Sequence, residues 1–426
     1  MVTKNIEVGS YNLHLIKTDK FKSLFFEIII TKKLKKEDIT ITNLLIDNMS
    51  FSTKKYNTLR LMNIKKQDLY NAFFLASNKR LGKTMQTKLT FSMLNPKYTE
   101  ESMLEESIEF LKEIIYNPNI EQDAFNETIF NRIKEENIID IKGSLTNPKY
   151  YASQRLKELM NEKEVISYKQ AGYLEDIEKI ASKDLYEYYK KFFKNANIDF
   201  YVVGDFNQKE IESIITKNFK FNNTNKPLLD IKYNYQNKRE SCQEVIEQSS
   251  FNQSVFATNY NLKNLTQKEK NYTMILYNII LGNSPESRLF KNIREKKSFA
   301  YSINSSYKYS DNTLIIFAGI NSKNYEDVKI SINEEIENLK ENLIEEKELE
   351  NAKQLFISTL KETEEYPSSI IDFNYNKKYF KSKNIDNQIK IIEKITREEI
   401  LKVAKKITLD TIYLLKEGKN ETNTNQ

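Results

Sequence analysis

Histidine and cysteine are almost missing from this chain of 426 residues, which has one of each, His14 and Cys242. A catalytic zinc ion is usually held by three side chains, drawn from histidine, cysteine and carboxylates. A histidine-rich or cysteine-rich zinc centre within this chain is therefore excluded, as is an intrachain disulfide bond. His14 lies in an alternating stretch typical of a strand, and we interpret it as an ordinary strand residue.

Long apolar runs and a dominant charge are also missing. Glu27 interrupts the strongest early apolar stretch, Leu24 to Ile30, and nothing approaches the ~20 apolar residues of a membrane span. The first residues contain no apolar signal core. The 66 basic and 60 acidic residues are interleaved, whereas a nucleic-acid-binding protein concentrates positive charge on one face. With the absence of disulfides, this predicts a cytoplasmic protein that binds neither nucleic acid nor membrane.

Glycine and proline are scarce, at 8 and 6 residues, which favours long helices. Apolar residues recur at helical spacing over 100–115 and 124–140. Strands are predicted between the helices, with Phe25 to Thr31 and Thr87 to Met93 in one sheet. In the second half, Phe299 to Tyr309 and Thr313 to Ile320 should pair as a hairpin, and the helices 325–342 and 345–363 should follow.

This order of elements repeats in outline and predicts an α+β protein of two similar halves. Each half combines a mainly antiparallel sheet with several helices. We predict a first half at 1–221, a linker at 222–248 where the pattern fails, a second half at 249–417 and a polar, disordered tail at 418–426.

Three stretches resemble the insulinase-like or pitrilysin-like (M16) zinc peptidases. The most specific lies within Gly282 to Ile303, where Ser287-Arg288-Leu289-Phe290 is followed by Arg294-Glu295-Lys296 and then by Tyr301. The others are Tyr188 to Phe193 with the strand ending at Asp205, and Glu365 to Tyr375, which is similar to small bacterial members. The resemblance covers nearly the whole chain and implies two halves that face each other like a clam shell.

The zinc motif of that family, His-x-x-Glu-His, is degenerate here. Counting back from the turn Thr53 to Asn57, the motif falls on Asn43 to Asp47. Asn43 replaces the first histidine, Ile46 the general-base glutamate and Asp47 the second histidine. Isoleucine cannot accept a proton from a zinc-bound water, and asparagine is a poor zinc ligand. The distal glutamate falls near Asp140, within a helical turn; a hard cation held by Asp47 and Asp140 is a minor alternative.

The second half departs less from the family. The resemblance implies that Arg294 and Tyr301 bind the substrate carbonyl and stabilise the developing oxyanion, chemistry that suits a guanidinium and a phenol. Arg294 is expected at the end of a helix, and Tyr301 on the next strand, sharing a face with Phe299 and Ile303. Arg288 is interpreted as structural, tying its helix to a neighbour.

A chain without zinc ligands that keeps an Arg/Tyr pair resembles the inactive subunit of a bacterial heterodimer. The resemblance implies a partner of similar size that carries His-x-x-Glu-His and the zinc, and a peptide or small-protein substrate. By resemblance alone, such pairs are associated with maturing ribosomally made peptides or modifying a translation elongation factor. The alternative is a purely structural, scaffold-like M16 protein with no role in hydrolysis. The feature that distinguishes the two hypotheses is whether Arg294 and Tyr301 face an open cavity or are packed.

The purified chain should hold no stoichiometric zinc, because Asn43, Ile46 and Asp47 replace the motif and the chain has a single histidine. It should also fail to cleave peptides alone. Metal analysis after dialysis and a fluorescent-peptide assay test both statements. About one tightly held zinc ion per chain, or cleavage that a chelator stops, would contradict them.

Overall fold

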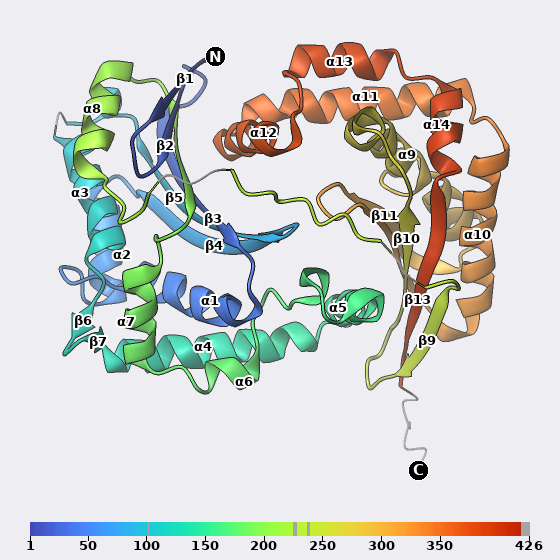
Figure 1. Ribbon diagram of the computed structural model, residues 1–426, viewed down its shortest axis with the longest axis horizontal. Helices are drawn as coiled ribbons and strands as arrows, with labels where there is room; N and C mark the ends of the chain where they lie inside the picture. Colours follow the sequence, from blue (N-terminus) through green and yellow to red (C-terminus); the bar gives the residue numbers. More distant parts are fainter. Residues whose placement is uncertain (101, 225–227, 237–238, 419–426) are drawn as a thin grey trace, which may run out of the picture. The chain divides into compact units, whose positions relative to one another are not determined.

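The computed structural model describes residues 1–100, 102–224, 228–236 and 239–418 (Figure 1). The predicted tail therefore lies, apart from Gly418, outside the described residues. The chain forms two compact units that do not follow the order of the sequence. The first contains Met1–Gly143, Lys169–Ile231 and Glu365–Tyr375, and the second contains Ser144–Tyr168, Lys232–Glu364 and Asn376–Gln426.

The first unit is built on a six-stranded sheet in the order β1-β2-β8-β3-β5-β4. Its strands are β1 (Val2–Glu7), β2 (Asn12–Lys17), β3 (Ser23–Lys33), β4 (Phe73–Leu81), β5 (Thr84–Leu94) and β8 (Asn197–Gly204). Adjacent strands are antiparallel except β2 and β8. The predicted pairing of Phe25 to Thr31 with Thr87 to Met93 is confirmed, with Ile28 opposite Leu89.

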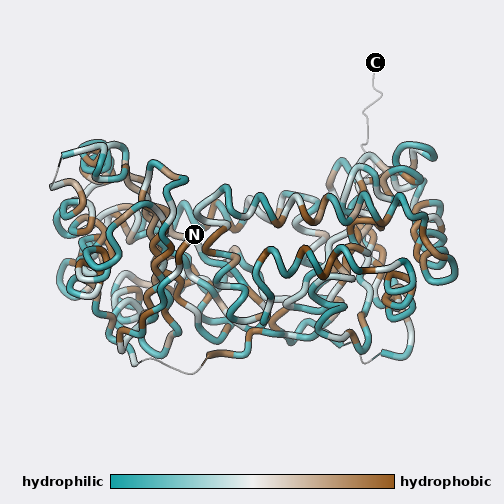
Figure 2. Tube along the Cα trace, turned by 90° about the horizontal axis from the view of Figure 1, so that it is seen from above, coloured by the Kyte–Doolittle hydropathy of each residue, from teal (hydrophilic) through white to brown (hydrophobic). Residues whose placement is uncertain are grey.

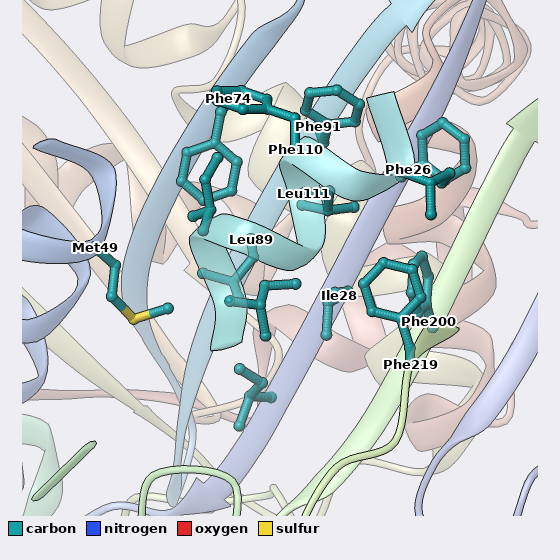
Figure 3. Close-up of a cluster of buried hydrophobic side chains, with 14 of the residues drawn as sticks. Phe26, Ile28, Met49, Phe74, Leu89, Phe91, Phe110, Leu111, Phe200 and Phe219 are labelled. Carbon is teal, nitrogen blue, oxygen red and sulfur yellow. The ribbon is translucent and has the colours of Figure 1, made fainter. Parts of the chain in front are cut away.

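One face of this sheet packs against the helices of the same unit. Phe26, Ile28 and Ile30 point into this core, while the alternate residues of β3 point to the other face. Figure 3 shows Phe26 and Ile28 with Phe110 and Leu111 of the neighbouring helix. The helices of this unit are α1 (Lys36–Phe51), α2 (Leu59–Asp68), α3 (Met103–Tyr116), α4 (Glu127–Leu145), α6 (Leu174–Ile177), α7 (Ser182–Lys191) and α8 (Gln208–Asn218).

The helix predicted at 124–140 corresponds to α4, which begins three residues after the predicted start and ends five residues after the predicted end. The short strands β6 (Ile120–Glu121) and β7 (Ala124–Phe125) form a tight hairpin before it, with Gln122 and Asp123 at positive φ. This left-handed turn cannot be part of a helix, so α4 starts at Glu127. The extension 141–145 contains only Ile141 and Leu145 as apolar residues, too few to continue the apolar pattern from which the end was predicted.

The second unit has a five-stranded sheet in the order β11-β12-β10-β13-β9. Its strands are β9 (Gln243–Gln248), β10 (Ser254–Leu262), β11 (Ala300–Lys308), β12 (Thr313–Ile320) and β13 (Ile407–Lys416). The predicted hairpin is confirmed as β11 and β12. The linker was predicted to extend to residue 248, but residues 243–248 form β9, which runs parallel to β13. Only Val245 and Ile246 are apolar in β9, too few to give a strand pattern.

Helices α9 (Met274–Leu281), α10 (Tyr325–Glu341), α11 (Glu346–Glu362), α13 (Ile385–Glu393) and α14 (Arg397–Ala404) supply the main core of the second unit. The predicted helices 325–342 and 345–363 are thus confirmed as α10 and α11. In Figure 2 many helices alternate between teal and brown along the tube. This alternation is expected of amphipathic helices that bury one side. None of the helices in the described residues combines the length and apolar character needed to cross a bilayer.

The opposite face of each sheet is covered by a helix from elsewhere in the chain. Helix α5 (Pro148–Asn161) packs Ala152, Leu156 and Met160 on Val255 and Ala257 of β10 in the second unit. The first turns of α12 (Pro367–Phe380) belong to the first unit. Each sheet is therefore completed by a segment that the order of the sequence assigns to the other half.

Polar contacts hold α12 on the first sheet. The Tyr375 hydroxyl lies 2.6 Å from the Thr31 hydroxyl, and the Lys88 ammonium lies 2.6 Å from Asp372. Lys88 also donates to Glu27 at 2.8 Å, and the side chain of Glu27 is only 3% exposed. Burial disfavours the ammonium, but Glu27 and Asp372 outweigh it and raise the pKa of Lys88. The buried charge of Glu27 is therefore neutralised by a single cation.

Lys88→Met should destabilise the protein by about 3 kcal/mol, because it leaves the carboxylate of Glu27 buried without its cation. Adding Glu27→Leu should recover much of this loss, since the unpaired charge is removed. Urea unfolding of both variants tests this. Lys97→Met, which breaks the exposed pair with Asp205, is the control and should have a much smaller effect. A double variant no more stable than Lys88→Met would contradict the account.

Candidate functional site

The degenerate motif lies on α1 in the first unit. Glu37 and Asp38 occupy the first turn of this helix, where carboxylates are favourable, and Leu44, Leu45 and Met49 bury one side in the core. Asn43 and Asp47 are half-buried, one turn apart, and Ile46 is 4% exposed. A helix with this spacing could present two ligands side by side, so the chemistry of these three residues decides what the site can hold.

The side chain of Asn43 is committed to neighbours on both sides. Its Nδ2 donates to the backbone carbonyl of Gln170 at 2.9 Å, and its Oδ1 accepts from Nδ2 of Asn78 at 3.0 Å. Asn78 in turn accepts from the Thr87 hydroxyl at 3.3 Å. The amide thus links α1 to β4, β5 and the loop at 170.

Asp47 accepts a hydrogen bond from Nδ2 of Asn137 on α4, at 2.8 Å. Burial raises the pKa of Asp47; Asn137 opposes this shift, and the charges of Asp140 and Glu136 add to it. Sequence reasoning placed the distal position near Asp140. Asp140 is close enough to act electrostatically, but Asn137, one turn earlier on α4, makes the contact. No sequence signal singles out Asn137, because its role depends on how α4 packs against α1.

These residues do not fit a catalytic zinc ion. The Asn43 amide is already bonded, Ile46 offers no donor and Asp47 is paired with an amide. Within the described part of the chain, no group of three or more His, Cys, Asp or Glu side chains is arranged to hold a metal. A hydrogen-bonded network occupies the positions at which we predicted a degenerate zinc motif.

Arg294 lies in the second unit, near the end of the π-helical segment η4 (Phe290–Lys296). Its side chain is exposed, and the guanidinium carbon lies 4.5 Å from the centre of the Phe290 ring. Among the described residues it has no ion pair or hydrogen-bonded side-chain partner. Its five donors are therefore available to a ligand.

Tyr301 lies on β11, the edge strand of the second sheet, and is 63% exposed. Its hydroxyl has no hydrogen-bond partner among the described residues. The expectation that Tyr301 shares a face with Phe299 and Ile303 is wrong. The pairing with β12 shifts between Ala300 and Ser302, so Tyr301 is the extra residue of a β-bulge and turns outward, while Ile303 packs into the core.

Arg288, six residues before Arg294, is held in a different way. It binds both carboxylate oxygens of Glu348 on α11, at 2.8 and 2.9 Å, and donates to Asn338 of α10 at 2.6 Å. Burial works against ionisation of Glu348, yet the Arg288 guanidinium lowers the pKa of that carboxyl. Arg288 therefore ties η4 to two helices, in agreement with its structural interpretation.

A close packing contact fixes the start of this segment. The carbonyl of Gly282, at the end of α9, accepts from the backbone N–H of Ser305 on β11 at 3.0 Å. A Cβ at Gly282 would lie 2.9 Å from that same nitrogen. Only glycine permits this approach. The loop between α9 and η4 is thereby anchored to the strand that carries Tyr301.

Comparisons with known proteins agree with this organisation. The model of the peptidase M16 inactive domain matches residues 179–356. The probable inactive metalloprotease YmfF of Bacillus subtilis is 26% identical over 96% of each chain. The uncharacterized zinc protease YmxG of the same organism is 30% identical over 33% of this chain and 35% of its own length. The crystal structure of a conserved protein from Enterococcus faecalis V583 superposes with a TM-score of 0.91 at 25% identity, covering 98% of this chain and 99% of that one.

Asp47→Asn should stabilise the protein at pH 7. Burial raises the pKa of Asp47 in the folded protein, so above that pKa the ionised side chain lowers the free energy of unfolding. Below the unfolded pKa of ~3.9, Asp47 is protonated in both the folded and the unfolded protein, and this cost vanishes. The variant keeps the oxygen that accepts from Asn137. Its advantage in urea unfolding should therefore shrink between pH 7 and pH 4.

The exposed Asp19→Asn exchange is the control and should have little effect at either pH. An Asp47→Asn protein that is less stable than the wild type at pH 7 would show that the carboxylate contributes favourably. That result would be expected if a bound cation depended on it.

Proposed function

Because the chain belongs to the M16 peptidase family, among its inactive members, we propose that it is the non-catalytic subunit of a two-subunit zinc peptidase. The partner in this proposal is an M16 subunit of similar size with an intact His-x-x-Glu-His motif. In that partner, zinc would activate the water that attacks the peptide. The chain described here would contribute Arg294 and Tyr301 to binding the substrate.

The contrast between Arg288 and Arg294 carries this proposal. The two arginines lie six residues apart in one motif, yet Arg288 is engaged by Glu348 and Asn338, whereas Arg294 is exposed and without an ion pair among the described residues. A residue retained only for packing is expected to look like Arg288. An arginine that serves a ligand should look like Arg294, with its donors free until the ligand arrives.

Tyr301 supports the same conclusion. A tyrosine retained for the core would bury its ring, as Tyr277 and Tyr413 do in this unit. The β-bulge instead turns Tyr301 out of the sheet, which is a common device for aiming a side chain at a functional site. A scaffold role without hydrolysis would give no reason for this exposure.

The chemical role follows from the two side chains. Attack on a peptide carbonyl converts its oxygen into an oxyanion, and donors that strengthen toward this charge lower the barrier. The Arg294 guanidinium supplies a cation with several N–H groups, and the Tyr301 hydroxyl supplies one O–H. Neither requires a metal in this chain. The substrate is proposed to be a peptide or a small unfolded protein.

In the complex, Arg294→Ala and Tyr301→Phe should each lower kcat by roughly 10²–10³, the scale for loss of one oxyanion donor. KM should change less, because these contacts strengthen in the transition state. The double variant should lose less than the sum of the two effects, since both donors serve one oxygen. Steady-state cleavage of a peptide by the reconstituted complexes is the measurement.

Arg60→Ala and Tyr98→Phe, two exposed side chains of the first unit, are matched controls that should leave kcat unchanged. All variants should co-elute with the partner and hold the same amount of zinc, because two polar side chains contribute little to an interface of this size. Rates within about twofold of the wild type for both Arg294→Ala and Tyr301→Phe would leave the scaffold role as the explanation.

A further inference from the structure

Two sides of the helical stretch that carries Arg294 are fixed by their neighbours. Side chains four residues apart lie on the same side of such a stretch. Leu289 and Ile293 are 0% exposed and pack in the core of the second unit. Arg288 and Asn292 bind the neighbouring helices, and Nδ2 of Asn292 donates to Glu335 of α10 at 2.6 Å. The core and these polar bonds together fix the rotation of the helix about its axis.

A third side of the stretch carries Phe290 and Arg294. Phe290 is half-buried, Arg294 is exposed, and the guanidinium carbon lies 4.5 Å from the centre of the Phe290 ring. Within the described part of the chain, the Arg294 side chain has neither an ion pair nor a hydrogen bond. The ring is therefore the group that the helix offers to this guanidinium.

An aromatic ring can hold an arginine without neutralising it. The negative face of the ring attracts the cation, and this attraction needs no N–H group to point at an acceptor. A carboxylate holds its arginine in another way, as Glu348 holds Arg288, because it occupies N–H donors and cancels the charge. An arginine that is to meet a developing oxyanion needs both its donors and its charge.

We propose that Phe290 is a positioning residue, which holds the Arg294 guanidinium ready for the substrate carbonyl and acts only through that arginine. This inference rests on the proposed function. An exposed cation–π contact favours the held conformation by about two- to fivefold. Loss of the ring should therefore lower kcat by about threefold, because the guanidinium is still present but is less often in place.

NMR of the isolated full chain tests the contact itself, without a partner subunit. A proton above the face of an aromatic ring resonates upfield, so the Nε–H signal of Arg294 should lie upfield of the signal of the exposed Arg60. Its loss in Arg294→Lys assigns the signal. It should move downfield in Phe290→Leu and stay in place in Phe290→Tyr, which keeps the ring. The same position in the wild type and in Phe290→Leu would overturn the proposal, whatever the complex does.

Steady-state cleavage of a quenched fluorescent peptide by the reconstituted complex tests the role of the contact. Phe290→Leu should lower kcat by about threefold with little change in KM, and Phe290→Tyr should keep the wild-type kcat. Phe51→Leu is the matched control, because the Phe51 ring lies 5.0 Å from the guanidinium carbon of Arg132 in the first unit. This control should leave kcat unchanged.

Fluorinated phenylalanines at position 290 separate cation–π attraction from simple packing. Each fluorine withdraws electron density from the face of the ring and changes its size only slightly. The kcat of the complex should therefore fall as the number of fluorines rises, whereas the melting temperature should change little. A kcat that is independent of fluorination would overturn the proposal.

The Arg294→Ala background distinguishes failure of this inference from failure of the proposed function. If Phe290 acts through Arg294, adding Phe290→Leu to Arg294→Ala should lower kcat no further. An equal loss of kcat in both backgrounds would assign Phe290 a structural role and overturn the inference, while the proposed function would stand. Wild-type kcat in Arg294→Ala itself would remove the proposed function, and this inference with it.

Discussion

Covering the second face of each sheet is the constraint on which the rest of this structure depends. Both sheets bury one face under their own helices, and both carry polar or charged side chains on the other. Glu27 and Lys88 in the first unit and Asp410 with Arg239 in the second are the clearest cases. Charges in such places are stable only when they are paired and hydrogen-bonded. The first turns of α12, helix α5 and the residues Tyr235 and Arg239 supply these partners, so neither half of the sequence completes its own sheet.

Helix α1 carries the three residues that we predict to replace the zinc motif. Helix α1 still packs its apolar side into the core, and it still presents two polar residues one turn apart. Their contacts are now amide to amide and carboxylate to amide. Such bonds require no metal to hold them together. The first unit is therefore held together by hydrogen bonds at the place where the resemblance to M16 peptidases implies a zinc motif.

The second unit keeps its conformational devices instead. Gly282 permits the close approach of a loop to β11, Arg288 fixes η4 to two helices, and the bulge turns Tyr301 outward. These three features position Arg294, whose guanidinium lies over the Phe290 ring, and Tyr301, which is exposed. Our proposal explains the exposure of both side chains by a ligand that meets them there.

The sequence by itself determined the α+β class, most strands and long helices, and the family resemblance, whereas the loss of the zinc motif at Asn43, Ile46 and Asp47 stays a prediction. These depend on local periodicity and on residue type, which are written directly in the chain. Only the tertiary structure decided that α5 and the start of α12 are exchanged between units, that Asn137 rather than Asp140 meets Asp47, and that Tyr301 leaves the face of Ile303. Each depends on contacts between residues far apart in sequence or on a single inserted residue in a ladder. A long-range contact or an inserted residue leaves no periodic signal in the sequence, because tertiary packing decides which residues meet.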